Sequence, residues 1–140
     1  MSRSQDIDTL ARTIWAEARG EGVAGMEAVA AVIMNRVNAD LGKDGRPDWW
    51  GEGVEGVCRK PWQFSCWNEG DPNRGKLIMV KASEDGWFAH AVEIAKRAIA
   101  GELPDKTGGA THYHAKSVKP KWSEGRQPCA EIGWHVFYKL

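Results

Sequence analysis

The sequence predicts a mainly α-helical (α+β) fold with a small antiparallel β-ribbon near the C-terminus. Two amphipathic helical patterns flank a pair of glycines, a third helical pattern follows, and the last third of the chain holds short, alternating aromatic segments. The chain has 140 residues, which is the length of one compact domain. We therefore expect residues 1–140 to form a single domain.

The helical patterns come first along the chain. Apolar residues recur every three or four positions over residues 7–19, where we expect the first helix. Gly20 and Gly22 interrupt this pattern, and glycine just past the last turn commonly ends a helix. The same spacing returns over residues 23–38, so the two helices should form a hairpin, and again over residues 87–99.

The intervening and C-terminal segments follow other patterns. Residues 41–61 are rich in Gly, Pro and charge, and we expect a long surface loop there. Residues 110–115 and 134–138 alternate and are rich in aromatics, which favours a two-stranded antiparallel ribbon. His112 and His114 should then share one face of a strand, with Tyr113 on the other face.

Charge and composition exclude several classes of partner. Nineteen basic and nineteen acidic side chains give a formal charge of zero, so the chain lacks the field that gathers nucleic acid. There is no run of about 18 apolar residues and no signal-peptide pattern at the start. We expect a monomer that neither binds nucleic acid nor inserts into a membrane. The three cysteines are expected to be buried, reduced thiols.

Eight tryptophans are a high count for this length, and their flat faces suit both a core and stacking on sugar rings. Trp15 and Trp87 fall on helix core positions. Five others lie in irregular segments and are candidates for a sugar-lined groove: Trp49, Trp50, Trp62, Trp67 and Trp122.

Two glutamates bracket the glycine turn of the expected hairpin. Glu17 lies in the last turn of a helix, where the helix dipole disfavours a charged carboxylate, so it should stay protonated longer. Glu21 precedes the second helix, whose free N–H groups favour an anion. Two carboxyl groups held apart in acidity suit glycoside cleavage. The spacing alone is weak evidence for such a site, because it favours an exposed helix residue at Glu17 and a capping residue at Glu21.

Four sequence blocks are more specific than this spacing. They are IWAEARGEG at residues 14–22, followed by a helix with Asn35-Arg36, then QFSCW at 63–67, GATHYHA at 109–115 and IGxHxFY at 132–138. In this order they resemble the cell wall hydrolases named after the spore cortex-lytic enzyme SleB. The resemblance implies a lysozyme-like domain that cleaves the β-1,4 bond between N-acetylmuramic acid and N-acetylglucosamine in bacterial peptidoglycan.

The resemblance also implies a role for Glu17, because the first glutamate of the EARGE segment is the family's catalytic acid. In a lytic transglycosylase a single glutamate serves as acid and then as base, while the 6-hydroxyl of muramic acid attacks. In a muramidase, a water molecule attacks in place of the 6-hydroxyl. Glu21 is then either a second catalytic carboxylate or structural. No metal or organic cofactor is expected.

Other side chains in the matching blocks are candidates for substrate binding. Gln63 and Ser65 are suited to hydrogen-bond an N-acetyl group, or else to satisfy the backbone of an ordinary turn. Arg36 is suited to hold a muramyl carboxylate, or else to form a surface ion pair. The complete set of expected substrate-binding residues is Arg36, Gln63, Phe64, Ser65, Trp67, His112, Tyr113 and His114. For Phe64 the sequence favours a place in the core over contact with the substrate.

Two alternatives of other classes remain open from the sequence. His112 and His114 have metal-ligand spacing, and a zinc hydrolase would add His135, Cys129 or Glu124 as a third ligand, although no H-E-x-x-H or paired C-x-x-C motif is present. The second alternative is a non-catalytic module that binds the cell wall through its aromatic residues.

The biological setting follows from the expected lack of an export signal. A short catalytic domain of this kind fits a phage or prophage endolysin, made in the cytoplasm and released to the wall with the help of a holin. The other interpretation is the catalytic part of a larger exported protein.

Overall fold

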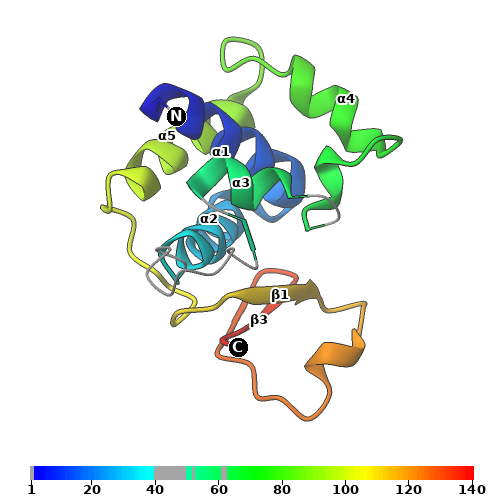
Figure 1. Ribbon diagram of the computed structural model, residues 1–140. Helices are drawn as coiled ribbons and strands as arrows, with labels where there is room; N and C mark the ends of the chain where they lie inside the picture. Colours follow the sequence, from blue (N-terminus) through cyan, green and yellow to red (C-terminus); the bar gives the residue numbers. More distant parts are fainter. Residues whose placement is uncertain (1, 40–49, 52, 61–62) are drawn as a thin grey trace.

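The computed structural model describes residues 2–39, 50–51, 53–60 and 63–140 (Figure 1). Helices α1 (Arg3–Ala18), α2 (Gly22–Ala39) and α5 (Gly86–Ile99) confirm the three expected helices. A single 3-10 turn, Arg19–Glu21, joins α1 to α2. Helix α1 begins four residues earlier than the apolar pattern, because Ser2 and Gln5 form a capping box that satisfies free backbone N–H groups.

Two shorter helices were not predicted. Helix α3 (Gly53–Arg59) lies within the segment expected to be a loop, so that expectation is wrong for these residues, while residues 40–49, 52 and 61 lie outside the described part. Helix α4 (Pro72–Met79) begins at Asp71, whose side chain accepts a hydrogen bond from the N–H of Asn73. Pro72 in the first turn also favours this start. Backbone N–H groups of the first turn have no acceptor within the helix, so a proline there costs no hydrogen bond.

The C-terminal third forms a small antiparallel sheet with strand order β1-β3-β2. Strand β1 (His112–Ala115) pairs with β3 (His135–Tyr138), with Tyr113 opposite Phe137, and this pair confirms the predicted ribbon. A third strand, β2 (Ala130–Ile132), pairs with the other side of β3 and was not predicted. The described chain therefore has β1 at one edge of the sheet, and Figure 1 shows β1 next to the helices.

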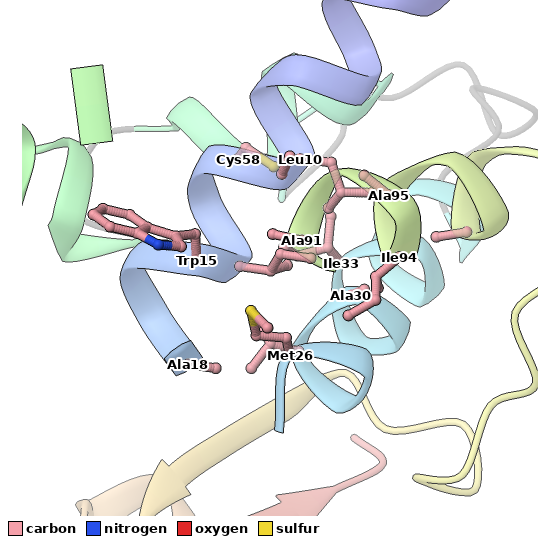
Figure 2. Close-up of a cluster of buried hydrophobic side chains, with 14 of the residues drawn as sticks. Leu10, Trp15, Ala18, Met26, Ala30, Ile33, Cys58, Ala91, Ile94 and Ala95 are labelled. Carbon is pink, nitrogen blue, oxygen red and sulfur yellow. The ribbon is translucent and has the colours of Figure 1, made fainter. Parts of the chain in front are cut away.

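The main core lies between α1, α2 and α5 (Figure 2). It contains fully buried residues from each helix, among them Ile14, Ile33 and Ile94. Trp15 is buried as expected, whereas Trp87 is 48% exposed, so its predicted place in the core is wrong. Trp87 is the second residue of α5, and its ring centre lies 5.9 Å from that of His90, while the next residue, Phe88, takes the buried position in this turn.

The cysteines divide into two groups. Cys58 and Cys66 are buried and free, as expected, whereas Cys129 is free but exposed, so burial was wrongly predicted for it. Cys129 directly precedes β2, on the outer part of the sheet. Among the described residues no helix is both long and apolar enough to cross a membrane.

Candidate active site

Glu17 lies in the last turn of α1, where the helix hairpin meets the sheet. Its side chain is partly buried, and its carboxylate oxygen Oε1 accepts a hydrogen bond of 2.9 Å from the hydroxyl of Tyr113 on β1. These two residues are 96 positions apart in the chain. The fold therefore brings together the EARGE and GATHYHA blocks, which the sequence pattern could not place side by side.

Two groups next to Glu17 are held in their protonated forms. Burial raises the pKa of the Tyr113 hydroxyl well above its ordinary value, and the charge of Glu17 adds to this effect. Burial, with the carboxylate of Glu17 and a hydrogen bond to it, also raises the pKa of the Cys66 thiol. Both groups thus remain hydrogen-bond donors beside the carboxylate. Cys66 is a site residue that sequence reasoning missed, although it lies within the QFSCW block.

Glu17 faces a cleft of about 290 Å³ between the helices and strand β1. The residues that line it come from α1, α2, the segment before η2 (Ser65–Trp67), η2 itself, β1 and the segment η3 (Lys121–Ser123). They are Glu17, Arg36, Gln63, Phe64, Ser65, His112, Tyr113 and Trp122. Glu17 is the one carboxylate among these described lining residues.

Arg36 forms one wall of the cleft and is 8% exposed. Its Nε donates a hydrogen bond of 2.6 Å to the backbone carbonyl of Thr111, which lies just before β1. Its guanidinium carbon lies 5.6 Å from the ring centres of both Trp50 and Phe64. Arg36 therefore joins α2 to the start of β1 and to the QFSCW segment, and the predicted surface ion pair is not its main interaction.

Gln63 lines the cleft, but its side-chain amide also holds the neighbouring backbone. Its Nε2 donates hydrogen bonds of 2.9 Å to the carbonyl of Trp50 and 2.8 Å to the carbonyl of Val57. These contacts fix the entry and the middle of α3 against the QFSCW segment. Of the two interpretations from the sequence, satisfaction of the backbone accounts for this amide nitrogen, while Ser65 nearby is exposed at the cleft.

The two faces of β1 carry different groups, as the alternation predicts. Tyr113 faces the helices and lies 5.1 Å, ring centre to ring centre, from His135 on β3. His112 and His114 both contact Trp122, at 5.2 and 5.7 Å between ring centres. His112 and Trp122 line the cleft, whereas His114 lies beyond it, with its Nε2 3.1 Å from the Tyr138 hydroxyl.

Glu21 lies outside the cleft lining and contacts the turn between β2 and β3. Its carboxylate oxygen Oε1 accepts a hydrogen bond from the backbone N–H of Trp134 and lies 3.9 Å from Nδ1 of His135. Burial lowers the pKa of His135, although Glu21 and Glu17 both act to raise it. Glu21 thus joins the helix hairpin to the sheet.

The structure therefore brings six of the eight expected substrate-binding residues to the cleft with Glu17. His114 and Trp67 are the two that it does not bring there. Trp67 packs against the core, and its indole Nε1 donates a 2.9 Å hydrogen bond to the hydroxyl of Thr13. Trp49 and Trp62 lie outside the described residues.

The zinc alternative requires a third ligand beside His112 and His114. In the described part of the chain, no group of three or more His, Cys, Asp or Glu residues is arranged to hold a metal ion. Nδ1 of His112 lies 2.9 Å from the hydroxyl of Thr111, and Nδ1 of His114 lies 2.7 Å from the carbonyl of Ala115. These nitrogens have hydrogen-bond partners within the protein, and the alternative gains no support from them.

Comparisons with known proteins agree with the arrangement of these blocks. A family model described as Cell Wall Hydrolase matches residues 20–138. A spore cortex-lytic enzyme from Halalkalibacterium halodurans is 32% identical over 135 residues, which cover 94% of this chain and 34% of that protein. The spore cortex-lytic enzyme of Bacillus subtilis is 30% identical over 134 residues, covering 96% of this chain and 37% of that protein. The chain thus spans little more than a third of the length of these two relatives.

Two solved structures of catalytic domains match this chain over nearly the whole length of both proteins. The catalytic domain of the Bacillus cereus SleB protein superposes with a TM-score of 0.71 at 30% identity, over 97% of this chain and 91% of that one. The catalytic domain of a germination-specific lytic transglycosylase SleB from Bacillus anthracis gives the same TM-score and identity, over 96% of this chain and 93% of that one.

Proposed function

The chain belongs to the cell wall hydrolase family, and we propose that it cleaves peptidoglycan glycan strands at the N-acetylmuramic acid β-1,4 bond with Glu17 as the acid. The observation that carries this proposal is the position of Glu17. It is the one carboxylate among the described residues that line the cleft, and the Tyr113 hydroxyl and the Cys66 thiol both interact with it.

The proposed reaction needs one carboxyl group. Glu17 donates its proton to the glycosidic oxygen, the bond from that oxygen to the anomeric carbon breaks, and positive charge develops on the sugar ring. The 6-hydroxyl of the same muramic acid then attacks the anomeric carbon and returns a proton to Glu17. The products are a 1,6-anhydro sugar and a shortened strand with a free 4-hydroxyl. A tethered hydroxyl has a high effective concentration, so no second carboxylate is required to position water.

Two observations favour this lytic transglycosylase route over hydrolysis. Glu21, the candidate second carboxylate, is bonded to the backbone of Trp134 and does not line the cleft. The Bacillus anthracis relative is itself described as a lytic transglycosylase. We infer that Glu17 performs both proton transfers and that Glu21 has a positioning role. The endolysin setting expected from the sequence stays a prediction.

The hydroxyl of Tyr113 is suited to orient Glu17 throughout the reaction. Because burial keeps this phenol protonated, it donates to one carboxylate oxygen and leaves the other free to meet the glycosidic oxygen. The indole of Trp122 is suited to stack on a sugar ring in the cleft, and the guanidinium of Arg36 to bind a muramyl carboxylate, whereas Phe64 is buried in the main core and supports the wall of the cleft.

The test is the substitution Glu17→Gln, assayed by release of soluble fragments from purified peptidoglycan. We expect an unchanged thermal unfolding curve and a loss of activity of about 100-fold or more. The matched control is Glu93→Gln, because Glu93 is an exposed glutamate on α5. Full activity of the folded Glu17→Gln variant would refute the proposal and favour the metal-dependent alternative, in which a chelator should abolish activity. A folded wild-type chain that binds peptidoglycan but releases no fragments would instead favour the non-catalytic module.

The same digest tests the route. Mass spectrometry distinguishes an anhydro product from a reducing end, since the two differ by one water molecule. A product ending in a reducing sugar would leave Glu17 as the acid and refute the intramolecular step alone.

A further inference from the structure

An exposed tryptophan lies at the turn between β2 and β3, outside the cleft described above. Trp134 is 56% exposed, although its immediate neighbour His135 is largely buried. Trp134 occupies the first unspecified position of the IGxHxFY block. A large aromatic ring that stays exposed is a candidate contact for a ligand, because it offers a rigid, flat apolar face.

Strand β1 shows where Trp134 lies relative to Glu17. The strand begins beside Arg36, which binds the carbonyl of Thr111, and its second residue, Tyr113, binds Glu17. Just past its end, the N–H of Lys116 donates a 2.9 Å hydrogen bond to the carbonyl of Trp134. Following β1 from one end to the other therefore leads from Arg36, past Glu17, to Trp134. Along the backbone of β1, the contact to Glu17 therefore lies between the contact to Arg36 and the contact to the turn that carries Trp134.

The turn that carries Trp134 is fixed to the helix hairpin. Glu21 accepts the N–H of Trp134, and Glu21 is one helical turn along the hairpin from Glu17. Gly133 has a positive φ of 58°, and a Cβ at this position would lie 2.6 Å from Oε1 of Glu21. Glycine is thus required for the turn to approach the carboxylate. These contacts hold the backbone of Trp134 while its side chain remains exposed.

A cationic group accompanies the exposed ring. Nζ of Lys116 lies 5.9 Å from the centre of the Trp134 ring and 3.7 Å from a carboxylate oxygen of Glu131, which is itself 61% exposed. A tryptophan face next to an ammonium group fits a sugar ring that carries a carboxylate substituent. Muramic acid in the glycan strand carries such a group as a free lactyl carboxylate where its stem peptide has been removed, and elsewhere the lactyl group carries a peptide that ends in carboxylates.

We propose that Trp134, with Lys116 beside it, is a second sugar-binding site for the glycan strand, at the opposite end of β1 from Arg36. The inference rests on the proposed function, because it takes the glycan strand as the ligand. The Trp134 ring stacks on a pyranose face, and Glu21 positions that ring through the backbone of the turn. Glu21 is thereby a positioning residue of the binding site rather than a second catalytic carboxylate.

The experiment compares Trp134→Ala with Trp87→Ala, a matched control. Trp87 is a similarly exposed tryptophan at the start of α5, and it is 48% exposed. Each substitution is made in the active chain, for KM and kcat on purified peptidoglycan glycan strands, and in the Glu17→Gln chain, for binding to sedimented peptidoglycan. We expect Trp134→Ala to weaken binding about tenfold, with the loss greater in KM than in kcat, and Trp134→Phe to restore most of it.

The outcomes are separable. Equal affinity and KM for Trp134→Ala and Trp87→Ala, with an active wild-type chain, would overturn the second site and leave the proposed function intact. A wild-type chain that releases no fragments would instead refute the proposed function. If Trp134→Ala were to unfold, the binding of Trp134→Phe to peptidoglycan is compared with that of Trp134→Leu. Both side chains fill the position, and only phenylalanine has an aromatic ring. Equal binding by those two variants would also overturn the proposal.

Discussion

Substitution of Glu21 separates a positioning role from a catalytic one, because glutamine and alanine differ in what they remove. Glutamine keeps a side-chain oxygen that accepts the N–H of Trp134 but removes the carboxylate charge. Alanine removes both. If Glu21 acts only by holding the turn, Glu21→Gln should retain activity within about threefold, whereas the loss of a general acid or base typically costs about 100-fold or more.

The stability change expected for Glu21→Ala follows from its contacts. A hydrogen bond to a charged group contributes roughly 1.5–3 kcal/mol when it is buried. The Glu21 side chain retains 21% exposure, so we expect the lower end, about 1.5 kcal/mol. For a domain of this size that corresponds to a decrease in Tm of about 5 °C. Glu21→Gln should lose about half as much, since its amide oxygen is a neutral acceptor.

The assays are differential scanning calorimetry for Tm and fragment release from peptidoglycan for kcat and KM. The exposed Glu93 again provides the control, with both Glu93→Gln and Glu93→Ala expected to leave Tm and activity unchanged. A folded Glu21→Gln variant with wild-type Tm and kcat lowered about 100-fold would refute the reasoning, because the carboxylate charge would then be needed for the chemistry.

Three further predictions follow from groups near the site. Tyr113→Phe removes the hydrogen bond to Glu17 and should lower kcat about 10- to 100-fold in steady-state assays, with KM little changed; an unaltered kcat would contradict the orienting role. In the native chain at about pH 8, a thiol reagent should label Cys129 alone, and all three cysteines in denaturant, because the other two are buried; rapid labelling of more than one native thiol would contradict this. Burial lowers the pKa of His135 and His112 below 6.5, so the unfolded chain binds protons first as pH falls, and stability should decrease from about pH 7 to 5. Thermal unfolding across this range should show a smaller decrease for His135→Gln, and an identical decrease would be evidence against the assignment.

The parts of the fold that the sequence predicted are those with sustained periodicity. Helices α1, α2 and α5 each bury a full apolar stripe, so their spacing is visible in the sequence. Helix α4 has only Leu77 buried, with Gly75 in its middle, and therefore leaves no periodic pattern. Strand β2 has three residues, which is too short for alternation to be distinguished from chance.

The sequence predicts which residues belong to the candidate site but not how they are arranged in space. The family resemblance identified Glu17 and most of the cleft residues, whereas helix-end electrostatics distinguished Glu17 from Glu21 in acidity but gave no evidence that a site exists there. The different roles inferred for Glu17 and Glu21 depend on which segment each one meets, Tyr113 on β1 or the turn at Trp134. Those contacts span 96 and 113 positions, and no local pattern encodes them.

The same contacts imply that the site forms only when the sheet is docked on the helices. Glu17 and Glu21 both lie on the hairpin, and both bind partners in the sheet through their side chains. Arg36 adds a third connection, from α2 to the start of β1. The second core cluster, with Phe137 packed against Ala28 and Val32, provides the apolar contact between the two parts. Separation of the sheet would break all of these contacts together, so a substitution such as Phe137→Ala should lower activity and stability in parallel.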